Sequence, residues 1–398
     1  MGVDYDVVVV GAGPGGSTAA RFCAKAGLKT LLIEKENMPR YKACGGCLSL
    51  KTIDFLDLDL SPVLENTIYG VRFSHRMKDP FSIASKEPVA FMVMRDRFDH
   101  FLVSKALEEG SGFLEGVKVI RAEEKRDGME VVLSQGEKIH AEYLIGADGS
   151  ESMVAKSLSL VPSKGSGVGV ESEIPYESTR GFPKEELQRI HLNFGGVPNG
   201  YGWVFPKEEG LSIGIGGMFT DGVRMNPRKY FAEFLKGLNY IREEKVIKVV
   251  GHSLPCFYDE EQKVAKGRVL LVGDAARLMD PLLGEGIYYA LRSGRLAAEA
   301  ILYSKENGSL PSSRYQSAIH DQISENLKWA LRFSRFVFRF TPLAYRTLEH
   351  YPELADVYLQ VLEGKETYQG FVVRVKERMR NLLQGRLSEK IRKAMARV

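Results

Sequence analysis

One stretch near the start of the chain constrains the fold more than any other. Four valines, at residues 7–10, run directly into the glycine pattern of residues 11–16, and a helical pattern follows to residue 26. A second apolar segment, residues 30–33, ends at the acidic residue Glu34. Strand, glycine turn, helix, strand and acid occur in the order of a βαβ unit that holds a dinucleotide. We therefore predict an α/β fold with a Rossmann-like nucleotide-binding domain.

Each residue type in this motif has a physical reason. Gly11 allows a tight turn, Gly13 lets the backbone approach a pyrophosphate, and Gly16 lets the helix pack closely on the strand. The helix N-terminus points free N–H groups at the phosphates. Glu34 is placed to accept hydrogen bonds from ribose hydroxyls, and its charge disfavours a 2′-phosphate. The cofactor-binding residues predicted here are Gly11, Gly13, Pro14, Gly15, Gly16, Glu34 and Lys35.

Bulk properties restrict the class of protein. The chain has 398 residues, of which 44% are hydrophobic and 27% charged, and its net charge at pH 7 is +4. Such a balance predicts no nucleic-acid partner. Four cysteines are too few for a disulfide scaffold in a chain of this length. No apolar run reaches the ~18 residues that span a bilayer, and no signal peptide is evident. We expect a cytoplasmic protein in a reducing environment.

Positive charge is concentrated near the C-terminus. Residues 371–398 carry nine basic and two acidic side chains, and residues 329–348 are dense in aromatic residues and arginines. A basic helical segment of this kind can rest on anionic lipid or on an acidic partner. A solvated helix face explains the same pattern. A peripheral contact with the inner face of a membrane is therefore one of two interpretations of this basic segment.

The pattern along the chain predicts a discontinuous nucleotide-binding domain, residues 1–160 and 251–305. Alternating runs between residues 167 and 217 predict an antiparallel sheet. We assign this substrate domain to residues 161–250, with a contribution from residues 65–95. Residues 306–398 read as a helical C-terminal region.

Three further segments carry small or charged residues where strands end or helices begin. Two are Gly146-Ala147-Asp148-Gly149 and Gly273-Asp274, and the third is Arg95 at the start of a helical pattern. Together with the glycine motif they resemble the FAD-dependent reductases and monooxygenases related to aromatic hydroxylases. The resemblance spans residues 4–300. It implies non-covalently bound FAD, with a substrate sheet over its ring. The additional cofactor-binding residues are Arg95, Ala147, Asp148, Gly149, Gly273, Asp274, Pro281, Gly284, Gly286 and Ile287.

Two segments resemble the geranylgeranyl reductase family in particular. They are Tyr41-Lys42-Ala43-Cys44-Gly45-Gly46 and the pattern Tyr201-x-Trp203-x-Phe205-Pro206, with Gly214-x-Gly216 after it. The family saturates prenyl double bonds in lipids, chlorophyll side chains or quinone tails. The resemblance implies that Cys44 is catalytic, as a proton donor or by positioning the alkene. It also implies that the substrate is bound by Gly45, Gly46, Tyr201, Trp203, Phe205 and Pro206.

The chemistry of alkene saturation agrees with this choice. A hydride and a proton must reach the two carbons in a dry pocket, and a prenyl chain needs an apolar slot. Tyr201, Trp203 and Phe205 alternate along one strand and therefore point to one face. They also suit an ordinary sheet core. Likewise Cys44 suits a small buried hydrophobe, and we interpret Cys47, which the family pattern does not require, as packing.

Other functions remain open from the residues alone. A flavin monooxygenase acting on an aromatic or polyketide-like substrate would share the nucleotide motifs. A non-enzymatic prenyl carrier on the same scaffold is disfavoured because Glu34 and Asp274 are present where FAD needs them. The expected partners are a prenylated lipid and an electron donor, either ferredoxin or NADPH. The histidines and cysteines show no metal-ligand spacing, so no metal is expected.

Overall fold

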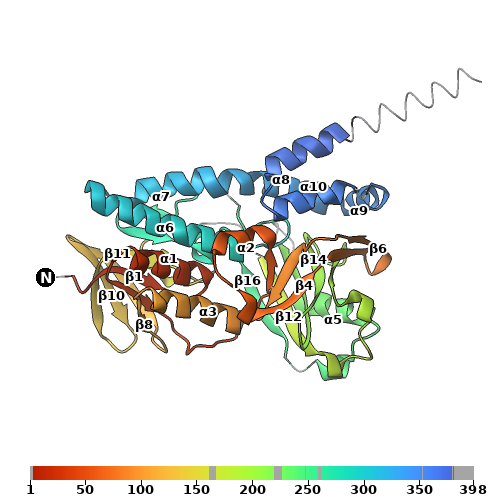
Figure 1. The fold of residues 1–398 in the computed structure, drawn as a ribbon, viewed down its shortest axis with the longest axis horizontal. Coiled ribbons are helices and arrows are strands. Elements are labelled where there is room, and N and C mark those ends of the chain that lie inside the picture. The colour runs from red at the N-terminus through yellow and green to blue at the C-terminus, as the bar shows by residue number, and fades with distance from the viewer. Residues whose placement is uncertain are drawn as a thin grey trace, which may run out of the picture.

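The structure is a computed structural model that describes residues 3–160, 167–218, 226–246, 248–258, 261–351, 353–378 and 380. Within these residues the chain forms three sheets and a set of C-terminal helices (Figure 1). In the view of Figure 1 the nucleotide-binding sheet lies on the left, the largest antiparallel region on the right, and the C-terminal helices run across the top.

The nucleotide-binding sheet has eight strands, with a path β17-β18-β11-β1-β2-β8 and a hairpin of β9 and β10 beside β11. The four central pairs, from β18 to β8, are parallel. The strands are β1 (Tyr5–Val10), β2 (Thr30–Ile33), β8 (Gly112–Leu114), β9 (Val119–Lys125), β10 (Gly128–Leu133), β11 (Lys138–Gly146), β17 (Ala265–Lys266) and β18 (Val269–Leu271). Thus β18, which follows the substrate sheet in the chain, returns to the first sheet beside β11.

Two helices explain why the valines of β1 are buried. Val7, Val8 and Val9 have no exposed surface, because the helices α1 (Pro14–Lys25) and α6 (Ile287–Asn307) belong to the same core. The two helices approach so closely that a Cβ on Gly294 would collide with the carbonyl oxygen of Gly15. These glycines therefore allow α6, which comes late in the chain, to pack against the first βαβ unit.

The second sheet has seven strands in the order β16-β12-β15-β14-β13-β5-β6. Its neighbours are antiparallel except β13 and β5, which run parallel with Ile190 opposite Val71. The predicted antiparallel sheet is present, and it contains this one parallel pair because β5 arrives from an earlier part of the chain rather than through a hairpin. The strands are β5 (Gly70–His75), β6 (Lys78–Ala84), β12 (Gly167–Pro175), β13 (Arg189–Phe194), β14 (Gly200–Pro206), β15 (Gly210–Met218) and β16 (Val250–Leu254).

A small third sheet lies where the chain passes between the two larger ones. It consists of β3 (Cys47–Ser49), β7 (Ala90–Val93) and β4 (Leu64–Ile68). Its strands lead into the helices α2 (Leu50–Leu56) and α3 (Arg95–Glu108). Two short helices, α4 (Met153–Ser157) and α5 (Pro227–Gly237), complete the two domains. This sheet anchors the C-terminal end of the Cys44 segment described below, because Cys47 begins β3 and Val93 of β7 donates its N–H to the carbonyl oxygen of Gly46.

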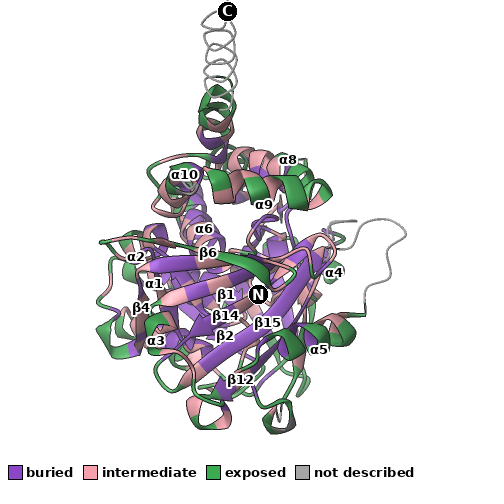
Figure 2. Ribbon diagram, turned by 90° about the vertical axis from the view of Figure 1, so that its right-hand side faces the viewer, coloured by how far each residue is buried: buried purple, intermediate pink, exposed green. Residues whose placement is uncertain are grey.

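The C-terminal helices pack on both large sheets: the first contacts α6 and the nucleotide-binding sheet, and the others contact the loop before α6 and the seven-stranded sheet. They are α7 (Pro311–Ile319), α8 (Glu325–Arg339), α9 (Thr341–His350) and α10 (Glu353–Leu362), with a π-helical turn at His320–Ser324 and a further helix from residue 368. Figure 2 shows α8, α9 and α10 above the sheets, with much of their surface exposed. Residues 381–398, which hold most of the predicted basic tail, lie outside the described residues.

The part of the chain that the structure describes contains no helix long and apolar enough to cross a bilayer. It also contains no group of three or more histidine, cysteine and acidic residues arranged to hold a metal ion. Its four cysteines are free thiols.

Candidate active site

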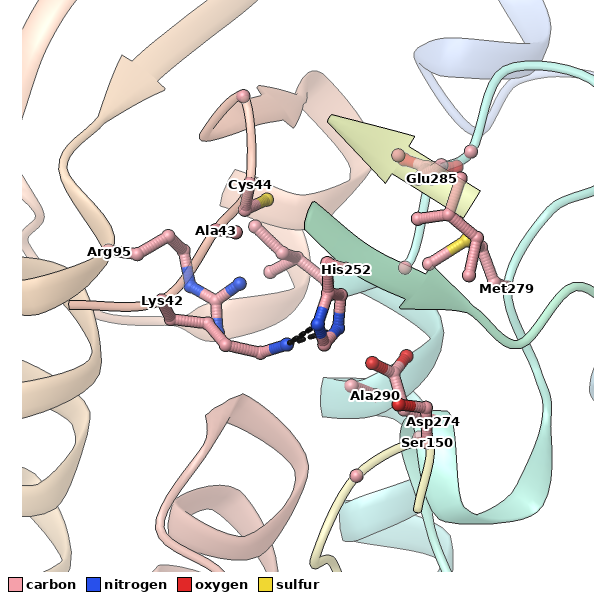
Figure 3. A pocket seen from close by; sticks show the side chains of 18 of the residues that line it. Lys42, Ala43, Cys44, Arg95, Ser150, His252, Asp274, Met279, Glu285 and Ala290 are labelled. Atoms are coloured by element: carbon pink, nitrogen blue, oxygen red, sulfur yellow. Dashed lines mark hydrogen bonds between the residues drawn. The ribbon is translucent and has the colours of Figure 1, made fainter. Parts of the chain in front are cut away.

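One cavity of about 820 Å³ runs between the nucleotide-binding sheet and the seven-stranded sheet. Its walls come from the turn after β1, the segment 40–47, strands β12, β14 and β16, and the loop before α6. Figure 3 shows part of this cavity, where Lys42 and Cys44 face His252 of β16 and residues near α6. Side chains of α8 and α10 also line it. Segments far apart in the sequence thus share one cavity.

The glycine turn leaves room for a phosphate. Gly11 has a φ of +103°, and a Cβ on Gly11 would collide with the carbonyl oxygen of Ala147. A Cβ on Gly16 would collide with the carbonyl oxygen of Gly11. A Cβ on Gly13, in contrast, would meet no atom closer than 3.9 Å. The N-terminus of α1, with Pro14 and Gly15 in its first turn, therefore opens onto the cavity.

Glu34 lies at the end of β2 and braces this turn. Its carboxylate is buried, and Oε2 accepts a hydrogen bond of 2.8 Å from the N–H of Ala12. The Nε atom of Arg40 lies 3.5 Å from the same oxygen. Both Glu34 and the exposed Lys35 line the cavity. The carboxylate is thus held at the position where the motif expects a ribose.

The segment after β11 lines the cavity with Ala147, Asp148 and Gly149. The Asp148 carboxylate accepts hydrogen bonds from the hydroxyl of Ser152 at 2.5 Å and the N–H of Met153 at 2.7 Å. Burial raises the pKa of Asp148 above its usual value. Its side chain therefore stabilises the start of α4, and the small residues beside it leave room in the cavity.

The loop before α6 supplies the opposite wall. Asp274 faces the cavity close to His252, as Figure 3 shows. Gly273 has a φ of +56° and donates its N–H to the hydroxyl of Ser293 at 2.9 Å. The remaining predicted residues of this loop also line the cavity, and α6 begins at its end. They are Pro281, Gly284, Gly286 and Ile287.

Cys44 projects into the cavity from a segment tied to β12. The N–H of Cys44 donates to Glu171 Oε1 at 2.7 Å, and the hydroxyl of Tyr41 donates to the same oxygen at 2.8 Å. Gly45 passes so close to the aromatic wall that a Cβ there would lie 2.7 Å from the ring of Phe205. Gly46 has a φ of +71°. Glycine is therefore required at both positions for the segment to reach its place.

Arg95 lies beside Cys44 at the start of α3 (Figure 3). Its guanidinium forms two hydrogen bonds with Asp99, at 2.8 and 2.9 Å. Burial opposes its charge, but Asp99 and Cys44 outweigh this effect and raise the pKa of Arg95. A permanently charged group thus lies next to the thiol.

The aromatic residues of β14 form one wall. Tyr201, Trp203 and Phe205 point to one face, with ring centroids 6.2 and 6.1 Å apart along the series. The hydroxyl of Tyr201 donates to the carbonyl oxygen of Leu283 in the loop before α6. Pro206 is buried at the end of the strand. Apolar side chains from four other elements line the same cavity, namely Val71, Ile190, Leu192, Phe338, Leu359 and Leu362.

The cavity also holds a polar pair that no sequence pattern predicted. Lys42 Nζ lies in hydrogen-bond contact with the ring of His252, shown dashed in Figure 3. Burial and the charge of Lys42 lower the pKa of His252 to about 4. Lys42 belonged to the segment that the sequence singled out. His252 and Glu171 carried no motif, and only the pairing of β16 and β12 brings them here.

These features fit FAD from one end to the other. The open space at Gly13 suits a pyrophosphate, the buried Glu34 suits the adenosine ribose, and Asp274 suits the ribityl chain. The N-terminus of α6 is oriented to favour negative charge on a bound ring. The aromatic wall then lies beyond the cofactor end of the same cavity.

Comparisons with known proteins agree with this geometry. Residues 4–174 match the family model of an FAD-binding domain, and residues 172–253 match that of the geranylgeranyl reductase catalytic domain. A digeranylgeranylglycerophospholipid reductase from Thermoplasma volcanium is 30% identical over 80% of this chain and 84% of its own length. A chloroplastic geranylgeranyl diphosphate reductase from Oryza sativa is 32% identical, over 76% and 67%.

The fold has a counterpart among solved structures. A geranylgeranyl bacteriochlorophyll reductase-like protein from Thermoplasma acidophilum superimposes with a TM-score of 0.76. It is 24% identical, and the match covers 94% of this chain and 98% of that one. The two family models, the relatives and the cavity lead to one conclusion: the chain belongs to the geranylgeranyl reductase family and is an FAD-dependent oxidoreductase.

Proposed function

We propose that this protein saturates isolated C=C bonds in the prenyl chain of a lipid. One observation carries the proposal: a single cavity combines the dinucleotide-binding turn with an aromatic and aliphatic wall. A prenyl chain has no polar handle, so its slot must recognise it by shape and apolar contact. The two relatives described above are named for prenyl substrates, which supports the same choice.

In this mechanism bound FAD, once reduced, supplies the hydride. The wall formed by Tyr201, Trp203 and Phe205 excludes water and holds the alkene flat against the cofactor end. Cys44 lies beside Arg95, and the next residue, Gly45, packs against Phe205 of that wall, so the thiol of Cys44 is placed to contact the chain. The hydrogen bond from the N–H of Cys44 to Glu171 keeps Cys44 in this position.

The decisive experiment follows the cofactor and the product together. The purified protein is reduced chemically without oxygen and mixed with geranylgeranyl diphosphate or digeranylgeranylglycerophospholipid. The proposal predicts that flavin absorbance returns and that the lipid gains the mass of two hydrogen atoms per double bond. Oxygen-dependent hydroxylation of an aromatic substrate, with no change in any prenyl lipid, would instead support a monooxygenase. NADPH and reduced ferredoxin, supplied separately in place of the chemical reductant, identify the electron donor.

We further propose that α8 and α9 rest on an anionic membrane surface. Their exposed side carries Phe336, Phe340 and Leu343, which are 50, 44 and 59% exposed. The two helices also carry four exposed arginines, and the three on α8 are three or four residues apart. They are Arg332, Arg335, Arg339 and, on α9, Arg346. The three on α8 lie over the aromatic rings of Trp329, Tyr258 and Phe340. Within the described residues no carboxylate forms an ion pair with any of the four, so their positive charge can attract lipid headgroups.

The position of this surface supports the assignment. Phe338 of α8 lines the cavity, while Phe336 and Phe340 on either side of it are exposed. The same helix therefore has one side in the cavity and another in solvent. A prenyl lipid held in a bilayer would have a short path to the slot if this helix lay on the membrane.

A further inference from the structure

Saturation of an alkene needs a proton as well as a hydride, and an apolar cavity does not readily provide one. Asp280, in the loop before α6, lines the cavity and is 1% exposed. Its Oδ1 accepts hydrogen bonds from the N–H groups of Leu282 at 2.6 Å and Leu283 at 3.3 Å. A carboxyl group is thus held rigidly in the wall of the slot.

A chain of two tyrosines connects Asp280 to the C-terminal helices. The hydroxyl of Tyr368 donates to Asp280 Oδ2 at 2.5 Å, and the hydroxyls of Tyr358 and Tyr368 lie 3.0 Å apart. Tyr368 is fully buried, and its N–H donates to the side chain of Asn326 at 2.8 Å. Tyr358 is half-buried on α10. The line of hydroxyls therefore leads from α10 to the cavity.

The protonation states suit a proton path. Burial raises the pKa of Asp280, and the carboxylate of Glu285 adds to this effect. The hydrogen bonds from Tyr368 and Leu282, and the charge of Lys51, oppose it without cancelling it. Burial also raises the pKa of the Tyr358 and Tyr368 hydroxyls, which therefore keep their protons.

We propose that Asp280 donates the proton for alkene saturation, and that Tyr368 and Tyr358 deliver its replacement. The O–H bond of Asp280 breaks as a C–H bond forms at the alkene carbon that does not receive the hydride. The electron pair for this bond comes from the alkene π bond, and the hydride supplies the other hydrogen with its pair. Tyr368 then passes its proton to the carboxylate and is reprotonated through Tyr358 from solvent. This inference rests on the proposed function.

Three other buried or partly buried carboxylates in the cavity are already engaged. Glu285 lies 2.6 Å from Lys51 Nζ and accepts a hydrogen bond of 2.5 Å from Ser49, so an ion pair holds its charge. Glu171 holds the Cys44 segment, and Glu34 braces the glycine turn. Asp280 differs because its partner hydroxyl leads away from the cavity. This assignment leaves Cys44 to position the alkene.

The test measures how fast chemically reduced protein transfers its electrons to geranylgeranyl diphosphate in a single turnover. Asp280→Asn keeps an acceptor for the loop N–H groups but has no acidic proton, so we expect the flavin to reoxidise at least ~100-fold more slowly. Tyr368→Phe should slow this step by roughly 10-fold and should alter its solvent deuterium isotope effect, which a purely structural role would leave unchanged. Both variants should bind FAD as the wild type does.

Tyr315→Phe is the matched control, because this buried tyrosine donates to the carbonyl oxygen of Leu271 and does not line the cavity. It should react at the wild-type rate with an unchanged isotope effect. Wild-type transfer rates and isotope effects in both Asp280→Asn and Tyr368→Phe would overturn the inference while leaving the reductase intact. Failure of the wild-type protein to transfer electrons to any prenyl probe would overturn the proposed function itself.

Discussion

The two ends of the cavity are built in different ways. At the cofactor end, contact is made by backbone: glycines at residues 11–16 clear space, and Glu34 locks the turn through the N–H of Ala12. At the substrate end, contact is made by side chains from β14, the Cys44 segment and the C-terminal helices. A backbone site depends on a few residues next to one another in sequence. A site lined by side chains tolerates substitution of those side chains, so its substrate specificity can change.

The contrast predicts that a small change at the cofactor end has the largest effect. In Gly16→Val the new side chain collides with the carbonyl oxygen of Gly11, and we expect flavin absorbance of the purified protein to fall to background. The free energy of unfolding should drop by about 3 kcal/mol, as in overpacked cores. Gly110→Ala is the control: its Cβ meets no atom within 4 Å, so it should retain flavin even though the φ of +96° at this position strains the backbone. A fully yellow Gly16→Val protein would show that this turn does not hold the cofactor.

The next largest effect is expected in membrane binding, where the outer surface of α8 is compared with the outer surface of the nucleotide-binding sheet. Changing Arg332, Arg335 and Arg339 to glutamine removes three positive charges, each worth about 1 kcal/mol at an anionic membrane. Binding to phosphatidylserine-containing vesicles in a flotation assay should therefore weaken by roughly 100-fold. The control changes three exposed basic residues on the nucleotide-binding sheet to glutamine, and it should bind like the wild type. These are Arg121, Lys125 and Lys138. Equal losses in both triple variants would indicate only a general charge effect.

A smaller effect is expected at the Cys44 thiol. Cys44→Ala leaves the cavity open but removes the contact that positions the alkene, so turnover of geranylgeranyl diphosphate should fall by about 30-fold with FAD retained. Cys23→Ala changes a buried cysteine of α1 that does not line the cavity and should leave turnover within a few-fold of the wild type. Unaltered turnover in Cys44→Ala would show that this residue only fills space in the wall of the cavity.

The smallest predicted effect concerns acid stability of the substrate sheet. Burial, with the nearby charge of Arg72, lowers the pKa of His191 on β13 to about 4, against its usual 6.5. His191 in the unfolded chain therefore binds a proton below about pH 6.5, whereas in the folded chain it does so only below about pH 4. The free energy of unfolding therefore falls as the pH is lowered through this window. At pH 5.5 the loss is about 1.4 kcal/mol relative to pH 7. Urea unfolding at both pH values should show a shallower dependence for His191→Gln.

Ser172 is a buried residue of β12 in the same sheet, and its hydroxyl does not titrate in this range. The variant Ser172→Ala is therefore the matched control and should keep the wild-type slope between pH 7 and pH 5.5. An identical pH dependence in His191→Gln and the wild type would mean that other groups set the acid stability.

The sequence predicted the cofactor end closely. The βαβ unit appears as β1, α1 and β2, and every predicted cofactor-binding residue except Gly16 lines the one cavity. Gly16 instead packs beneath the turn, against Gly11 and Ala147. The FAD prediction and the family resemblance are confirmed by the family models. These features depend on neighbours in sequence, where turn geometry and strand periodicity are visible.

The substrate end was predicted only in part. The alternation of Tyr201, Trp203 and Phe205 showed that they share a face, and the family pattern pointed to Cys44. The partners of these residues were invisible, because Glu171, His252 and Asp280 come from separate strands and loops with no spacing rule. The parallel pair of β5 and β13 was missed for the same reason.

The amino-acid sequence by itself determined the dinucleotide turn, the acid after β2 and the family, because each of these is a local pattern whose geometry follows from a few adjacent residues. Tertiary structure alone decided that Tyr368 reaches Asp280 across 88 residues of chain and that Lys42 meets His252 across 210. Such contacts arise from how helices pack on sheets, and packing depends on the whole molecule rather than on any one segment.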